Sequence, residues 1–166
     1  MKQYEVAYPH FEFFGPSPVD YNTHRVEGEC VWEELCKFNL LNEIQSGKTK
    51  IGVIFNHDPH DLPGSHWVCL FIDTRKKYIL YFDSYGDKPP KEIKFFINTV
   101  KKQSNKLGTP YKVIINKVRH QYSTSECGMY SLYVIITLLK GMDVDKLISK
   151  KIPDKLVFKL RKKYFN

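Results

Sequence analysis

The spacing of hydrophobic positions changes several times along the first half of the chain. Apolar side chains recur close to the helical period over residues 29–45, which predicts a helix that Ser46-Gly47 ends. Three later segments are rich in β-branched and aromatic residues and predict strands: residues 51–56, 67–73 and 77–83. Only three residues (74–76) join the last two segments, so we expect an antiparallel hairpin.

Helical spacing returns in the second half. Pro89-Pro90 suits the first turn of a helix extending to about residue 105, and the apolar stripe follows at i, i+3, i+4 and i+7: Ile93, Phe96, Ile97 and Val100. Residues 111–116 predict another strand. Residues 127–139 are apolar on nearly every side, which is typical of a buried helix. Gly141 marks the end of this predicted helix. Pro153 opens a terminal amphipathic helix, whose predicted apolar side is formed by Leu156, Val157, Leu160 and Tyr164.

These elements predict an α+β fold. We expect a small mixed or antiparallel central sheet, a buried helix packed against it, and flanking helices. The opening segment, residues 11–20, mixes aromatic with turn residues, and we expect an ordered arm lying across the body. No Gly-, Ser- or Pro-rich linker divides the 166 residues, so we predict a single domain: an N-terminal arm and helix (1–50), a core (51–141) and basic C-terminal helices (142–166).

Composition narrows the class of protein. The chain is 42% apolar, 14% aromatic and 27% charged, which argues against disorder, and no apolar run is long enough for a membrane span. Its four cysteines form no CxxC pair, and no secretory segment opens the chain. We therefore expect an intracellular, non-secreted protein with reduced thiols. We interpret Cys30 and Cys36 as packing residues of the first helix and Cys69 as a core residue.

The net charge of +8 is concentrated in two stretches, residues 98–120 and 142–166. Such stretches favour non-specific attraction to DNA or to acidic partners. Solvated helix faces that keep a small protein soluble would produce the same pattern.

Four residues carry candidate chemistry. Cys127 begins the buried helix, where the helix dipole favours a thiolate. His66 precedes the first strand of the hairpin and Asp83 ends the second, so the hairpin places them side by side. Gln121 stands six residues before Cys127. A thiol, a base, an acid that orients the base and an amide donor are the parts of a cysteine-nucleophile site.

Each of these residues has a simpler explanation on its own. A lone cysteine before an apolar helix is most often a small core residue, Asp83 could cap a turn, and loop glutamines are common. A metal site is another alternative, because one loop gathers His57, Asp58, His60, Asp61 and His66. Zinc sites usually need three or four committed ligands, and His66 is better suited to the catalytic set, so we expect neither a metal nor a cofactor. The conjunction of all four candidate residues favours catalysis.

The pattern resembles one clan of cysteine proteases. It is similar to the motif of the clan that contains the adenovirus maturation protease and the SUMO and ubiquitin-like-protein proteases. The matching positions are His66-Trp67, an acid 17 residues later at Asp83, and Gln121 six residues before Cys127-Gly128. The match extends over residues 51–141. The resemblance implies an adenain-like fold of the papain-like type, a catalytic triad and no cofactor.

The resemblance also implies a role for each residue. Cys127 would be the nucleophile, His66 the base, Asp83 the orienting acid and Gln121 the oxyanion donor. Trp67 would wall a narrow channel that admits only glycine, which implies cleavage of Gly-Gly or Gly-x-Gly sites. SUMO proteases carry Trp-Leu-Asn-Asp before their first helix, whereas this chain has Trp32-Glu33-Glu34-Leu35 on the predicted helix, so no substrate role passes to Trp32.

Within the clan, the chain looks most like virion-maturation proteases of large DNA viruses and virophages. This similarity implies a monomeric endopeptidase that processes capsid or core precursors and is packaged in virions or active in infected cells. The alternative is a deconjugase of SUMO or ubiquitin-like proteins. Acetyltransferases of the same clan, and a DNA-binding module with an inactive triad, are further hypotheses from other classes.

Overall fold

The computed structural model describes residues 1–24 and 28–165. A five-stranded mixed sheet forms its centre, in the order β1-β2-β3-β4-β5. The strands are β1 (Phe11–Pro18), β2 (Lys50–Asn56), β3 (Trp67–Asp73), β4 (Tyr78–Phe82) and β5 (Lys112–Ile115). β2, β3 and β4 are antiparallel, and the outer pairs β1–β2 and β4–β5 are parallel. The predicted α+β class and the β3–β4 hairpin are confirmed.

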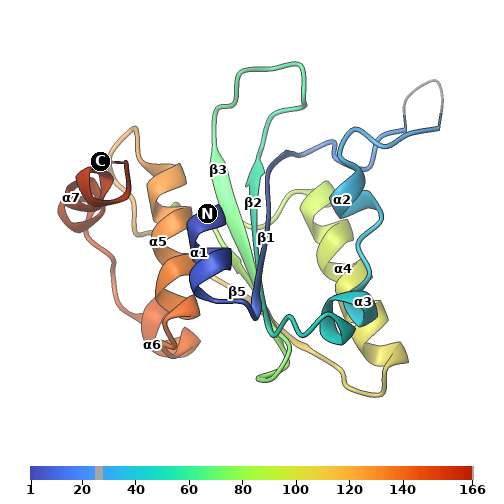
Figure 1. Cartoon of the computed structure of the whole chain (residues 1–166). Helices are drawn as coiled ribbons and strands as arrows, with labels where there is room; N and C mark the ends of the chain where they lie inside the picture. The colour runs from blue at the N-terminus through green and yellow to red at the C-terminus, as the bar shows by residue number, and fades with distance from the viewer. Residues whose placement is uncertain (25–27, 166) are drawn as a thin grey trace.

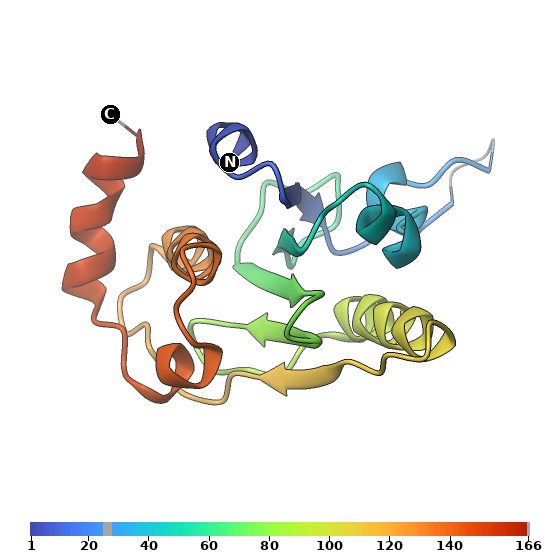
Figure 2. The same ribbon diagram turned by 60° about the horizontal axis from the view of Figure 1, so that its bottom comes forward.

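Helices cover both faces of this sheet (Figure 1). One side carries α1 (Lys2–Ala7), α5 (Cys127–Leu139), α6 (Val144–Ser149) and α7 (Asp154–Phe165). The other side carries α2 (Glu33–Cys36), α3 (Leu40–Gln45) and α4 (Lys91–Lys106). Figure 2, turned by 60°, shows α7 outside α5, away from the sheet.

Alternation along the strands divides the apolar core into two clusters. Successive strand residues point to opposite faces. Cys69 and Phe71 of β3 therefore join the cluster around α5, while Leu70 and Ile72 join the cluster around α4. The fully buried Cys69 is a core residue, as predicted. The packing of α5 against the β3–β4 hairpin in the first cluster fixes their positions relative to each other.

The opening segment is an edge strand rather than an arm across the body. β1 pairs in parallel with β2, and the register shifts between Phe14 and Ser17. Gly15 lies in this irregularity with φ +110°, and a Cβ there would lie 2.6 Å from the Ile54 carbonyl oxygen. Backbone pairing of this kind depends on a distant partner strand, which local composition does not reveal.

The helix predicted over residues 29–45 is wrong as one element. The chain instead forms the short helices α2 and α3, which residues 37–39 separate. The side chain of Gln103 on α4 bonds both sides of the break: its Oε1 accepts from the Leu40 N–H at 2.7 Å, and its Nε2 donates to the Phe38 carbonyl at 3.0 Å. Asn39 then caps α3 by accepting from the Asn42 N–H. The interruption thus replaces intrahelical bonds with tertiary ones.

The two helices predicted at the C-terminal end are present. α5 covers residues 127–139 as predicted, and its Ser131 hydroxyl donates to the Trp67 carbonyl at 3.4 Å. On α7, Val157 is buried and Leu160 and Tyr164 pack against the core. Leu156 is 39% exposed, so its predicted place on the apolar side is wrong. Among the described residues, no helix is both long and apolar enough to cross a membrane.

Candidate active site

The hairpin brings His66 and Asp83 together. His66 lies one residue before β3 and Asp83 one residue after β4, so both lie at the same end of the hairpin. The Nε2 atom of His66 is 3.0 Å from Oδ2 of Asp83, whose side chain is fully buried. This contact engages Nε2 and leaves Nδ1 of His66 free to meet another group.

Neighbouring groups fix both partners of this pair. The other oxygen of Asp83, Oδ1, accepts the Tyr85 backbone N–H at 2.7 Å. Nδ2 of Asn116 donates to the Asp83 backbone carbonyl at 2.8 Å. The Tyr85 ring stacks on His66 with centroids 5.0 Å apart, and His57 meets the imidazole edge-on at 4.9 Å. The imidazole therefore has little freedom to rotate.

Cys127 lies at the first turn of α5, where unpaired backbone N–H groups face outward. Burial tends to raise the pKa of its thiol, but hydrogen bonds with His66 and with the Trp67 and Gly128 backbone outweigh burial. The net effect lowers the thiol pKa. The residue before Cys127, Glu126, has a left-handed backbone conformation with φ +88°. A lowered pKa increases the thiolate fraction near neutral pH.

The pKa of His66 shifts in the opposite direction. Burial lowers it, yet the hydrogen bonds and charges of Asp83 and Cys127 together raise it to about 9. Opposite shifts in two hydrogen-bonded groups favour a thiolate beside an imidazolium. His57, next to His66, has its pKa lowered by burial and by the His66 charge, so it stays neutral there.

Gln121 lies in the same region but bonds to the protein itself. Its side chain is fully buried. Nε2 donates to the Ser123 carbonyl at 2.9 Å and the Ser125 carbonyl at 2.6 Å, while Oε1 accepts from the Ser84 hydroxyl at 2.7 Å. Gln121 therefore holds the loop before Cys127 against the residue that follows Asp83.

A cavity of about 630 Å³ opens beside the thiol. Its lining includes Cys127, Gly128, Trp67 and Glu126. A Cβ built on Gly128 would lie 3.8 Å from the Trp67 indole, which places this ring directly beside the first turn of α5. The next two nearest atoms from outside the helix turn, at 3.9 Å, also belong to Trp67. Trp67 thus forms the wall next to the nucleophile.

A second cavity of about 320 Å³ also borders Trp67. Trp67 and Pro16 line both cavities, and Trp32 lines the second. Trp32 precedes α2 as its N-cap residue, with an extended backbone, and does not belong to the helix. The placement of Trp32 on a helix is therefore wrong, and its indole shares a hollow with Trp67.

Residues 47–166 match the model of the Ulp1 protease family, C-terminal catalytic domain. The chain belongs to the Ulp1 protease family. The resemblance to the clan is thereby confirmed.

Viral proteins are among the relatives of this Ulp1-family chain. It is 34% identical over 172 residues to R355 of Acanthamoeba polyphaga mimivirus, a protein named as a thiol protease. This alignment covers 99% of this chain and 53% of that protein. It is 36% identical over 117 residues to the cysteine protease S273R of African swine fever virus, covering 69% of this chain and 43% of that protein. The chain thus spans about half the length of these relatives.

Solved structures share the fold of the Ulp1-family chain. The African swine fever virus pS273R protease superposes with a TM-score of 0.81 at 25% identity, over 99% of this chain and 63% of that one. The C-terminal Ulp1 protease domain in complex with Smt3, the yeast orthologue of SUMO, gives 0.63 at 21% identity, over 97% and 68%. The second likeness concerns the fold alone.

The residues considered for a metal in the 57–66 loop are engaged separately. His60 Nδ1 lies 2.7 Å from Asp20 Oδ2, and Asp58 accepts from the Ser65 hydroxyl. His66 faces Asp83. These residues are therefore close in sequence, but their potential ligand atoms do not converge on one point in space.

The interpretation of Cys30 and Cys36 as reduced packing residues of one helix is wrong. The two cysteines form a disulfide, Cys30 lies before α2, and Cys36 is its last residue. The helix begins only at Glu33, which explains the error, because a turn between Cys30 and Cys36 lets their sulfur atoms meet. Cys69 and Cys127 are the free cysteines of the described chain.

Sequence reasoning missed several residues of the site. Tyr85 stacks on His66, and Asn116 binds the Asp83 backbone. Glu126 lines the cavity, where its Oε1 accepts from Arg161 of α7 at 3.0 Å. Tyr85 could have been suspected from its place two residues after Asp83. The roles of Asn116 and Arg161 depend on contacts over more than 30 residues, for which the sequence carries no local signal.

Proposed function

We propose that this chain is a cysteine endopeptidase that cleaves protein substrates after glycine. One observation carries the proposal: His66, whose Nε2 is 3.0 Å from Asp83, interacts with the Cys127 thiol so that the pKa of the imidazole is raised and that of the thiol is lowered. A thiolate held beside an imidazolium is a nucleophile and a proton donor in one pair. Membership of the Ulp1 protease family supports the same chemistry.

In the proposed reaction, the Cys127 thiolate attacks the carbonyl carbon of the scissile amide. The His66 imidazolium gives its proton to the leaving nitrogen as the C–N bond breaks, which leaves a thioester on Cys127. A water molecule then attacks the thioester, and His66 takes its proton. The acid product leaves and the thiolate is restored. Asp83 holds the imidazole in place and supports its positive charge.

Two donors are proposed for the oxyanion that forms during each attack. The backbone N–H of Cys127, at the start of α5, requires no rearrangement to bind it. Gln121 Nε2 already donates to the Ser123 and Ser125 carbonyls, so it must exchange one of these bonds to reach the oxyanion. We therefore assign Gln121 a second task, the support of the loop that carries Cys127.

Trp67 supports the preference for glycine. Its indole lies against Gly128 and lines both cavities, so a substrate strand that extends from one to the other would pass this ring. Trp32 lines the second cavity together with Trp67. Glycine residues minimise the cross-section of a strand at such a passage. Gly-Gly and Gly-x-Gly sites are the proposed substrates.

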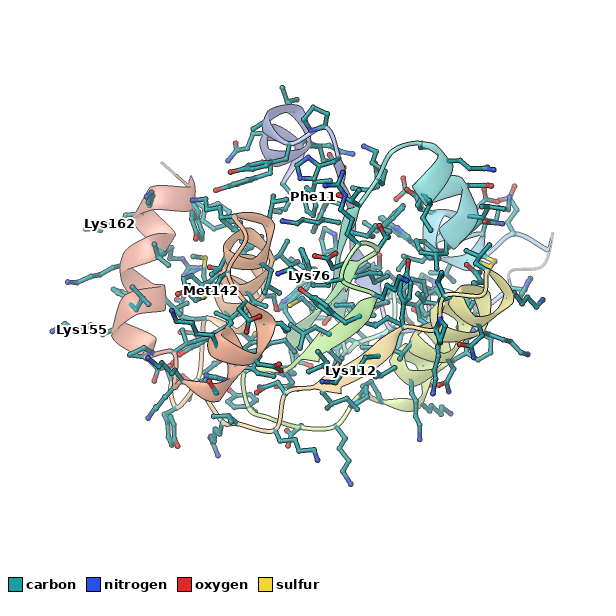
Figure 3. All side chains as sticks on the ribbon, turned by 90° about the horizontal axis from the view of Figure 1, so that it is seen from below. Phe11, Lys76, Lys112, Met142, Lys155 and Lys162 are labelled. Carbon is teal, nitrogen blue, oxygen red and sulfur yellow. A yellow bond between two sulfur atoms is a disulfide. The ribbon has the colours of Figure 1, made fainter. Side chains whose placement is uncertain are left out.

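The viral relatives favour capsid or core precursors as natural substrates, with the protease packaged in virions or active in infected cells. A deconjugase of SUMO or ubiquitin-like proteins is the second candidate, since Trp32 and Trp67 flank a passage that would also suit a C-terminal Gly-Gly. The basic stretches support a weak contact with DNA. Figure 3 shows Lys155 and Lys162 of α7 pointing away from the body, where a polyanion could reach them.

The test of this function compares Cys127→Ala with Cys69→Ala, a matched change at the other free cysteine. Peptides with glycine or alanine before the scissile bond, a capsid precursor and a SUMO conjugate are incubated with each variant. We expect cleavage after glycine by the parent and by Cys69→Ala, and none by Cys127→Ala. Cleavage that survives in Cys127→Ala would overturn the mechanism.

The same substrates separate the two candidates. Preferential cleavage of the precursor favours the endopeptidase, and preferential release of SUMO favours the deconjugase. Added DNA should raise the rate at low salt and lose this effect at high salt if the basic stretches bind it. Acetyl transfer from acetyl-CoA without peptide cleavage would instead favour the acetyltransferase hypothesis.

A further inference from the structure

A second cluster of reactive side chains lies outside the candidate active site. His24, Cys30 and Cys36 each offer one ligand atom, and these three atoms all lie within 4.8 Å of one another. Nε2 of His24 is 3.9 Å from Sγ of Cys30, which is bonded to Sγ of Cys36. None of the three residues takes part in the proposed protease reaction.

The backbone holds the three residues in place. The segments on either side of residues 25–27 are antiparallel: the Val31 N–H donates to the Thr23 carbonyl at 3.0 Å, and the Trp32 N–H donates to the Tyr21 carbonyl at 3.0 Å. His24 and Cys30 form a bridge pair in this arrangement. The first turn of α2 then returns the chain, so that Cys36 reaches Cys30.

The donor set is one that zinc prefers. Thiolate and imidazole ligands, with bonds of about 2.0–2.3 Å in a tetrahedron, lie roughly 3–4 Å from one another. The separation of His24 Nε2 from Cys30 Sγ already falls in this range. Cys30 is buried, while His24 is exposed, so a metal ion could enter from the solvent side and keep water as a fourth ligand.

We propose that His24, Cys30 and Cys36 form a zinc site when the disulfide is reduced. A dithiol or phosphine reductant supplies two electrons to the S–S bond, two protons complete the thiols, and the reductant is oxidised. Zinc then displaces one proton from each thiol and accepts the lone pair of His24 Nε2. The disulfide and the zinc complex are therefore alternative states of one site.

Either state constrains the segment that carries Trp32. This residue lies between the two cysteines and lines the second cavity. A metal bound to both Cys30 and Cys36 ties the ends of the segment together, as the disulfide does. Free thiols release that tie. The zinc site thus provides a cross-link for the channel wall in a reducing environment.

The experiment uses the full chain with Cys127→Ala, so that the active-site thiol binds no metal. The protein is reduced with a phosphine, freed of metal and titrated anaerobically with Co²⁺. We expect one equivalent to bind with a thiolate-to-cobalt charge-transfer band and intense visible bands of tetrahedral cobalt. Zinc should remove both signals by displacing cobalt.

Single substitutions assign the ligands. Cys30→Ser, Cys36→Ser and His24→Ala should each weaken cobalt binding by on the order of 10- to 100-fold or more. The matched changes Cys69→Ala and His10→Ala should leave affinity and spectrum unchanged. Circular dichroism of each metal-free variant checks folding.

Three results would overturn the proposal. One is a reduced, folded protein that binds no cobalt. Another is cobalt binding without the charge-transfer band, which indicates surface ligands other than thiolates. The third is an equal loss of binding in Cys69→Ala or His10→Ala, which would place the metal elsewhere.

Discussion

The side-chain amide of Gln121 donates to the Ser125 carbonyl oxygen at 2.6 Å, two residues before Cys127. The same nitrogen also bonds the Ser123 carbonyl. An amide that bonds the loop before the nucleophile affects stability as well as the reaction. These two contributions can be measured separately.

Substitution of Gln121 should reduce both activity and stability. Gln121→Ala removes the proposed oxyanion donor, a loss that typically lowers kcat by about 10²- to 10³-fold. It also leaves the buried Ser84 hydroxyl without its acceptor, at a cost of about 1–3 kcal/mol in the free energy of unfolding. Steady-state kinetics and urea unfolding measure the two effects. A fall in kcat with unchanged stability would show that loop support is not a role of Gln121.

The pH profile should report the His66 pKa. Activity needs the imidazolium, and Asp83 and Cys127 raise its pKa against burial to about 9. We therefore expect kcat/KM to fall as pH rises through about 9, because His66 then loses its proton. The rate of thiol alkylation at lower pH should exceed that of an ordinary cysteine, because the thiol pKa is lowered.

Asp83→Asn tests the source of that shift. The amide carries no charge, so the His66 pKa should fall and the alkaline limb should move to lower pH. The rate should also drop by on the order of 10³-fold or more, since the imidazole loses its orienting acceptor. An alkaline limb that stays at the same pH in Asp83→Asn would mean that Asp83 does not set the His66 pKa.

Trp67 should control the preference for glycine. Trp67→Ala removes the ring that lies against Gly128 and lines both cavities. We expect cleavage after glycine to decrease and the ratio of alanine to glycine cleavage to rise, measured on matched peptides. Trp32→Ala changes the second cavity alone and should affect KM without this change in ratio. Unaltered selectivity in Trp67→Ala would assign the preference to other residues.

Gly52 should be required for α5 to pack on the sheet. A Cβ at Gly52 would lie 2.9 Å from Ile135 Cγ2 and 3.1 Å from the Phe11 ring. Gly52→Ala should therefore cost about 1–3 kcal/mol in unfolding free energy by overpacking. Gly128→Ala, whose Cβ meets only ordinary contacts at 3.8 Å, is the matched control and should not destabilise. Adding Ile135→Ala to Gly52→Ala should cost less than the sum of the two changes.

Gln103 should stabilise the junction between α2 and α3. Gln103→Ala leaves the Leu40 N–H and the Phe38 carbonyl without their partners, at a cost of about 1–3 kcal/mol. The exposed Gln45→Ala should change stability by no more than about 0.5 kcal/mol. Chemical denaturation of both variants measures the difference. Equal effects would mean that solvent replaces the Gln103 bonds without cost.

The sequence by itself determined the features that depend on neighbouring residues. Helix α5 and the β3–β4 hairpin follow from periodicity and a short connection, because local spacing decides which face is apolar. The nearness of His66 to Asp83 follows from the hairpin. Cys127 at the first turn of a buried helix follows from the same spacing.

Only the tertiary structure decided the contacts between distant segments. Gln103 interrupts the predicted first helix from more than 60 residues away. The helix also begins only at Glu33, which leaves Cys30 and Trp32 outside it and lets Cys30 bond to Cys36. The Ser84 hydroxyl donates to Gln121 Oε1 across 37 residues of the chain. Such contacts depend on which surfaces meet after the chain packs, and no local pattern of residues encodes that.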